Sequence, residues 1–246
     1  MAASELSKGE EVGRSAFARM TAMIYWVIVL EIMFLVATSP GLIASFFVSA
    51  DLSNFPLFVA CLLPVGPALS GLVYSWRRRA IELDLSPAPR FWRGYRLNFV
   101  DVMKWWVPFL ILVAMGGFVA THLSLTFLSE SSVWLFVVLG VLAALWAAHM
   151  LILTSVFSFR TRDAARLAVY FFFRCFSTTL LYLSLLVVCF ALTYLVGMWL
   201  PVLAGSIFSA MYVRAAHTEI YLATDQFTLH EEDSEDESDE SGDDEE

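Results

Sequence analysis

Hydrophobic residues gather along this chain in long blocks that polar segments separate. Five of these blocks are long enough, at about 20 residues each, to cross a hydrocarbon core about 30 Å thick as helices. A sixth is shorter, so it either crosses a locally thinned membrane or packs as a half-span. The pattern predicts an all-α, polytopic membrane protein with about six transmembrane helices. The six blocks cover residues 20–38, 55–76, 106–128, 133–159, 178–200 and 202–216.

Prolines and glycines predict where these helices end or bend. The first span is expected to stop at Ser39-Pro40-Gly41, because proline and glycine end helices. The second contains Pro64 and Pro67 and is therefore expected to be kinked. Residues 1–19 are polar and include three glutamates, which does not fit a cleavable signal peptide. We therefore expect a polar cytoplasmic N-terminus followed by a retained span.

Two connections between spans read as amphipathic helices that lie at the membrane interface. In residues 91–106 apolar side chains recur at spacings of three and four, while cations occupy other faces. In residues 160–177 a basic stretch leads into Tyr170-Phe171-Phe172-Phe173, an aromatic run typical of membrane interfaces. Both helices are predicted to lie on the cytoplasmic side, with lipid headgroups as their first partner.

The lysines and arginines predict the orientation. All 15 of them fall into four groups, which an inside N-terminus and six crossings would place in the cytoplasm. The three remaining connections contain none, which matches the positive-inside rule. We therefore expect a plasma-membrane protein with both termini cytoplasmic. The basic residues expected at the interface are Arg77, Arg78, Arg79, Arg90, Arg93, Arg96, Lys104, Arg160, Arg162 and Arg166.

Composition supports the membrane class and isolates an acidic tail. Hydrophobic residues make up 59% of the chain and charged residues 16%, which excludes an ordinary soluble globule. The net charge is −9, but 12 of the 24 acidic residues lie in residues 231–246, so the rest of the chain is slightly basic. Residues 217–246 are predicted to form a disordered acidic cytoplasmic tail. No nucleic-acid partner is expected, because headgroups explain the basic residues better.

Ionisable side chains inside spans are candidates for function because burying a charge in the membrane is costly. Glu31, His122 and His149 stand away from the interfaces. Glu31 is expected near the midplane and His149 in the inner half of the membrane, so the two could touch and share a proton. A purely structural role, with Glu31 protonated and hydrogen-bonded to a backbone carbonyl, is the alternative.

Small residues predict close helix packing, and the sequence lacks known catalytic motifs. Gly140, Ala144 and Ala148 repeat at intervals of four, and Gly66, Ser70 and Gly71 cluster in the second span. The chain has no H-E-x-x-H, G-x-S-x-G or Walker A motif, so we expect no enzyme. Its three cysteines have neither C-x-x-C spacing nor a neighbouring histidine cluster, so no metal or other cofactor is expected.

Two stretches resemble the YesL family of small bacterial integral membrane proteins, which carry a domain of unknown function. Residues 63–72 read LPVGPALSGL and precede Arg77-Arg78-Arg79, and residues 91–99 read FWRGYRLNF. The positions that match the family pattern are Pro67, Gly94 and Asn98. The resemblance extends over roughly residues 20–215 and leaves the acidic tail outside it.

The resemblance implies a function but no catalytic or ligand residues. YesL-like proteins are often associated with carbohydrate uptake, so it implies a non-enzymatic accessory protein or partner of a solute importer, with sugar-importer permease subunits as possible partners. The alternative from the residues is a self-contained proton-linked transporter or channel that uses Glu31 and His149. The oligomeric state does not follow from the sequence.

Overall fold

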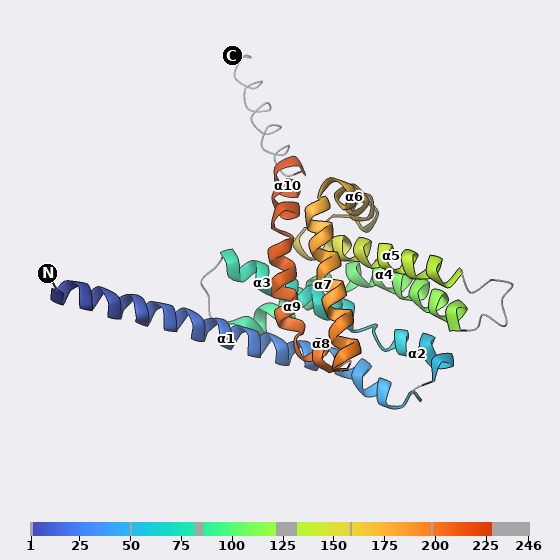
Figure 1. Ribbon diagram of the computed structural model, residues 1–246. Helices are drawn as coiled ribbons and strands as arrows, with labels where there is room; N and C mark the ends of the chain where they lie inside the picture. The colour runs from blue at the N-terminus through green and yellow to red at the C-terminus, as the bar shows by residue number, and fades with distance from the viewer. Residues whose placement is uncertain are drawn as a thin grey trace, which may run out of the picture.

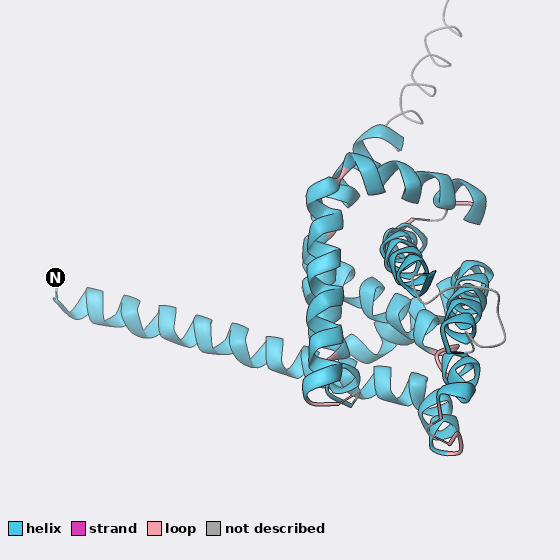
Figure 2. Ribbon diagram, turned by 45° about the vertical axis from the view of Figure 1, so that its right-hand side comes forward, coloured by secondary structure: helices cyan, strands magenta, loops and turns pink. Residues whose placement is uncertain are grey.

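The computed structural model describes residues 2–49, 51–81, 86–121, 132–157, 159–197 and 199–227, and over these ranges the chain is helical and contains no strand (Figures 1 and 2). This confirms the predicted all-α class. The helices are α1 (Ala2–Phe46), η1 (Leu52–Asn54), α2 (Phe55–Ala60), α3 (Val65–Ile81), α4 (Pro87–Thr121), α5 (Ser132–Val156), α6 (Thr161–Arg174), α7 (Phe176–Leu195), α8 (Trp199–Leu203), α9 (Gly205–Ala215) and α10 (His217–Phe227).

Within the described ranges, five helical segments are long and apolar enough to cross a membrane. They are Arg19–Phe46, Phe55–Arg79, Pro87–Ala120, Trp134–Val156 and Phe176–Leu195. The sixth predicted span does not join them, because the short helices α8 and α9 divide it. Instead, α9 leads into α10 with little interruption, since the amide of Ile220 donates to the carbonyl of Ala216 across the junction at 2.9 Å.

The first helix does not stop at Ser39-Pro40-Gly41, and that prediction is wrong. Proline lacks the amide that would bond the carbonyl four residues earlier, which here belongs to Val36. The hydroxyl of Ser39 donates to this same carbonyl at 2.8 Å, so the carbonyl keeps a partner and α1 continues to Phe46. A neighbouring hydroxyl is a known way for membrane helices to tolerate proline.

The second span is broken rather than kinked. α2 ends at Ala60, and a turn over residues 61–64 leads into α3. Pro67 lies in the first turn of α3, where helical amides lack intrahelical partners and proline is tolerated. The indole Nε1 of Trp106 donates to the carbonyl of Leu62 in the turn at 3.1 Å. A side chain of α4 therefore ties this turn to the neighbouring helix.

The two predicted interfacial helices differ in the structure. The segment 91–106 is not a separate helix, because α4 runs from Pro87 through it and on to Thr121. The second is separate: α6 buries Ala164, Ala168 and Phe171 along one face. Phe171 thus belongs to the core, while Tyr170 and Phe173 remain exposed on the predicted aromatic anchor.

Around α3 the helices form two hydrophobic cores. One core joins α1, α3 and the start of α4, and includes Trp26, Leu72 and Phe91. The other joins α3, α4, α5, α6, α7 and α10, and includes Met150 and Phe171. In Figure 1, α1 passes the lower end of the upright stack of α9 and α10, and it contacts α9 there.

Candidate functional site

A buried polar cluster connects α5, α7 and α10. The side chains of His149 and Glu219 are fully buried, and Nδ1 of His149 lies 3.0 Å from Oε2 of Glu219. The hydroxyl of Tyr182 donates to the same Oε2 at 2.9 Å. Glu219 therefore holds α10 against α5 and α7 through two polar contacts in an apolar core, where such contacts are strong and their loss is costly.

The other side of the imidazole ring is also occupied. Nε2 of His149 lies 3.0 Å from the hydroxyl oxygen of Thr179, and that hydroxyl also approaches the carbonyls of Phe172 and Cys175. The hydroxyl of Tyr212 in α9 donates to the carbonyl of Ala148. The ring of Tyr182 packs in tilted contacts against those of His149 and Tyr212, with centroids 5.0 Å and 4.8 Å away. The cluster therefore ties α9 and α10 to α5 and α7.

Glu31 lies elsewhere and does not pair with His149 as predicted. Its Oε2 accepts a hydrogen bond of 2.7 Å from the backbone amide of Ser206, and the amide of Gly205 also donates to the carboxylate. Both amides belong to the first turn of α9, whose amides have no intrahelical partners. The carboxylate of α1 thus caps α9, the role that a side chain at the helix's own N-cap fills elsewhere.

Removing this cap gives a testable effect on stability. We expect Glu31→Ala to lower the free energy of unfolding by about 1 kcal/mol, the usual value of a helix cap. Glu31→Gln keeps an acceptor oxygen and should therefore retain part of the stabilisation that capping gives. Thermal unfolding of the detergent-purified variants measures both. Equal stability of wild type and Glu31→Ala would contradict the capping role.

The remaining predicted polar and proline positions have different outcomes. His122 lies outside the described residues. Pro64 ends the turn before α3, and Gly66 lies so close to α4 that an added Cβ would be 2.6 Å from the ring of Trp106. The predicted close packing at Gly66 is therefore confirmed. Gly140 differs, because an added Cβ there would meet nothing within 4 Å.

The positions that match the family pattern hold α4 against α3. A Cβ on Gly94 would lie 2.6 Å from Cβ of Tyr74, so only glycine permits this approach. The amide Nδ2 of Asn98 donates to the hydroxyl of Ser70 at 3.0 Å and to the carbonyl of Ser155 at 3.4 Å. The hydroxyl of Ser155 in turn donates to that of Ser70 at 2.9 Å. Asn98 therefore joins α3, α4 and α5 from the middle of a helix.

Basic residues from α3, α4 and α9 gather on the side of the molecule where α1 carries Trp26. The guanidinium of Arg79 lies 5.1 Å from the Trp26 ring, and that of Arg90 lies 5.8 Å from it. Arg79 also shares one groove with Arg77 and Arg214. Cations that are far apart in the sequence thus occupy the same end of α3, α4 and α9.

Other predicted interface cations lie on exposed surfaces. Arg93 and Arg96 are exposed on α4, while Arg162 and Arg166 are exposed on α6. The ammonium of Lys104 pairs with Asp101 one turn away at 2.7 Å. The guanidinium of Arg78 lies 5.5 Å from the ring of Tyr74. Arg160 precedes α6 at its N-cap position.

Sequence reasoning did not identify Glu219 or Tyr182. Glu219 was assigned to the disordered tail from residue 217 onward, but α10 is helical through Phe227, which corrects that boundary. A signal was present: Ile220 and Ala223 of α10, together with Ala216 just before it, form an apolar face that also carries Glu219, and all four residues are buried. The strongly acidic residues that follow dominate the local composition, so this amphipathic segment was grouped with the tail.

The distribution of polarity defines the class of protein. Large apolar side chains are exposed along α1, α4, α5 and α7, whereas Ser70, Asn98, His149 and Glu219 are buried. A soluble protein of this size does not expose continuous apolar surfaces on so many helices. Together with the five long apolar helices, this pattern defines a membrane-embedded helical protein.

Comparison with known proteins gives a family match for part of the chain. Residues 26–120 match a family described as a protein of unknown function, DUF624, and the YesL family is a DUF624 family. The match covers the C-terminal part of α1 from residue 26 onward, α2, α3 and nearly all of α4, and it contains Pro67, Gly94 and Asn98. It confirms the resemblance seen in the sequence. No curated protein and no solved structure matches the chain.

Proposed function

We propose that this protein is a non-enzymatic accessory or partner of a solute uptake system, with carbohydrates as the solute class and importer permease subunits as its partners. It lies in the plasma membrane with both termini in the cytoplasm. The association with an uptake system is based on the resemblance to the YesL family. The gathering of Arg77, Arg79, Arg90 and Arg214 at one end of their helices supports the orientation, because cytoplasmic ends carry the excess of cations.

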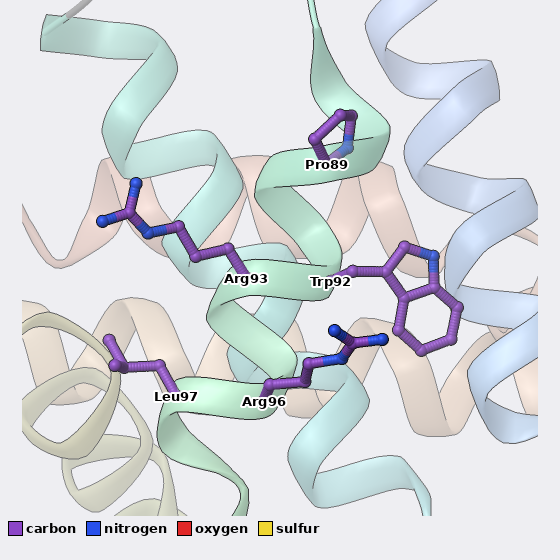
Figure 3. A pocket seen from close by; sticks show the side chains of 5 residues that line it. All are labelled: Pro89, Trp92, Arg93, Arg96 and Leu97. Atoms are coloured by element: carbon purple, nitrogen blue, oxygen red, sulfur yellow. The ribbon is translucent and has the colours of Figure 1, made fainter.

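The observation that carries the partner role is an exposed cationic face on the first turns of α4. Pro89, Trp92, Arg93, Arg96 and Leu97 line a hollow of about 740 Å³ there. Figure 3 shows Trp92 and Arg96 on one side of the helix, and Arg93 and Leu97 on the other. Tryptophan and arginine are enriched at protein interfaces, where they supply much of the binding energy.

Charge reversal on this face tests the role. We expect Arg93→Glu combined with Arg96→Glu to reduce recovery of permease subunits at least about tenfold when the protein is extracted gently and its partners are identified by mass spectrometry, because an opposed charge repels the acidic surface that arginines recognise. Wild type and variant are compared at equal membrane levels.

The matched control reverses the same number of charges on the other interfacial helix. Arg162→Glu combined with Arg166→Glu should leave recovery unchanged, since both residues lie on α6. Equal loss in both variants would point to general membrane electrostatics and contradict a docking face on α4. Recovery of the wild-type protein without any permease subunit would contradict the accessory function.

The second hypothesis was a proton-linked transporter that uses Glu31 and His149. It depended on contact between these residues, and the structure gives them different partners: Glu31 caps α9 and His149 meets Glu219. Both pairs connect helices. The accessory role is therefore the function that we propose.

A further inference from the structure

A second cationic feature of the molecule is a groove between helices rather than the face of a single helix. A groove of about 870 Å³ lies between α1, α3, α9 and α10, and four basic side chains line it. Its volume is in the range of small-molecule sites, about 300–1,000 Å³. The described residues that line it include no aspartate or glutamate. The basic residues are Arg77 and Arg79 of α3, Arg214 of α9 and His217 of α10.

The wall of the groove that α3 provides is fixed in place. The indole Nε1 of Trp76 donates to the carbonyl of Ser206 in α9 at 3.1 Å. The guanidinium of Arg79 lies 5.3 Å from the ring of Trp76 and 5.1 Å from that of Trp26. Contacts of a guanidinium with aromatic faces leave its in-plane N–H groups available to an anion. This arginine is therefore positioned before any ligand arrives.

The opposite wall is fixed by the buried cluster. α10 directs Glu219 inward to His149 and Tyr182, and the same helix places His217 and Tyr221 on the groove. Because Glu219 anchors α10, the groove keeps its shape without a ligand. A rigid site loses less conformational entropy on binding.

Among the described residues, no ion pair neutralises the arginines of the groove. Arg77 and Arg79 are half-buried, and within the described part of the chain no carboxylate pairs with Arg77, Arg79 or Arg214. Partly buried positive charge is costly unless an opposite charge accompanies it. Guanidinium groups bind phosphate oxygens through pairs of parallel hydrogen bonds, which makes phosphate the best-matched anion.

We propose that this groove binds a phosphate-bearing ligand, either the phosphate headgroup of a membrane lipid or a free phosphorylated solute. Arg77, Arg79 and Arg214 hold the phosphate oxygens. Met23, Val213 and Ile220 line the remainder of the groove and contact the apolar part of the ligand. The site goes beyond the proposed accessory role, because it does not involve the cationic face on α4.

The test uses the full-length protein in neutral detergent with two probes. Phosphatidylglycerol is titrated and counted on the protein by native mass spectrometry, and inorganic pyrophosphate binding is measured by equilibrium dialysis. We expect saturable binding of at least one probe. Arg77→Gln combined with Arg214→Gln should weaken it by about tenfold or more for each arginine removed, since each loses a charge-assisted hydrogen bond. Binding of phosphatidylglycerol alone identifies a lipid site, and binding of pyrophosphate alone identifies a solute site.

Matched variants separate a built site from general attraction. Arg162→Gln combined with Arg166→Gln removes the same charge from α6 and should leave the affinity unchanged. Arg77→Lys combined with Arg214→Lys keeps the positive charge but loses the planar guanidinium that forms two parallel hydrogen bonds with phosphate. This variant should have an intermediate affinity. Thermal unfolding without probe verifies that each variant folds. Equal weakening by the α3/α9 and α6 variants, or no saturable binding of either probe to the wild type, would overturn the proposal.

Discussion

Replacing Glu219 by alanine is expected to lower the free energy of unfolding by about 1–3 kcal/mol for each buried polar group that it leaves without a partner. The change leaves Nδ1 of His149 and the hydroxyl of Tyr182 buried and without the oxygen that they share. It also releases α10, because these contacts are its polar links to α5 and α7. Thermal or denaturant unfolding in detergent measures the loss, and limited proteolysis near Ala216 reports the release of α10.

Two further variants test whether the loss of stability comes from the buried polar groups that Glu219→Ala leaves without a partner. Glu219→Gln keeps an acceptor for Tyr182 and should cost less than Glu219→Ala. His149→Leu combined with Glu219→Leu removes both polar groups, and replacing a buried pair by apolar residues is often neutral. We therefore expect the double variant to be more stable than Glu219→Ala. The reverse order would show that His149 does not depend on Glu219.

Replacing Gly94 by alanine is expected to lower the free energy of unfolding by about 1–3 kcal/mol, the usual cost of overpacking a core. The new Cβ would lie 2.6 Å from Cβ of Tyr74, an atom next to the backbone that no rotamer change moves away. α3 and α4 must then separate, which also strains the hydrogen bond from Asn98 to Ser70. Thermal unfolding of the purified variant measures the cost.

Gly140→Ala is the matched control. It adds the same methyl group to a helix, but nothing lies within 4 Å of the new atom. Alanine favours a helix over glycine by about 1 kcal/mol, so this variant should be as stable as the wild type or more stable. Similar destabilisation by both substitutions would show that close helix approach is not the reason for glycine at position 94.

How far the sequence predicts the candidate site depends on how far apart the interacting residues are in the sequence. Burial of His149 inside a span followed from its position in a long apolar run. Its partner did not, because Glu219 is 70 residues away and precedes an acidic block that dominates the local composition. Glu31 was recognised as an unusual intramembrane carboxylate for the same reason as His149. Its partners are backbone amides of α9, which no residue pattern displays.

The continuity of helices was also partly beyond the sequence. Proline at position 40 predicts an end, but the hydroxyl of Ser39 supplies the missing donor to Val36 and the helix continues. Pro64 does coincide with a break, where Trp106 of α4 binds the carbonyl of Leu62 in the turn. Similar prolines have different outcomes because different neighbours satisfy the backbone.

The sequence by itself determined the all-helical membrane class, the approximate positions of five long apolar segments and the family resemblance within residues 26–120, because hydrophobic length and short motifs are local properties of the chain. Only the tertiary structure decided that Glu31 caps α9, that Glu219 joins His149, and that Arg77, Arg79 and Arg214 line one groove. These contacts join residues from separate helices. They arise when the helices pack, since helix ends and buried polar atoms take their partners from whichever helix lies beside them.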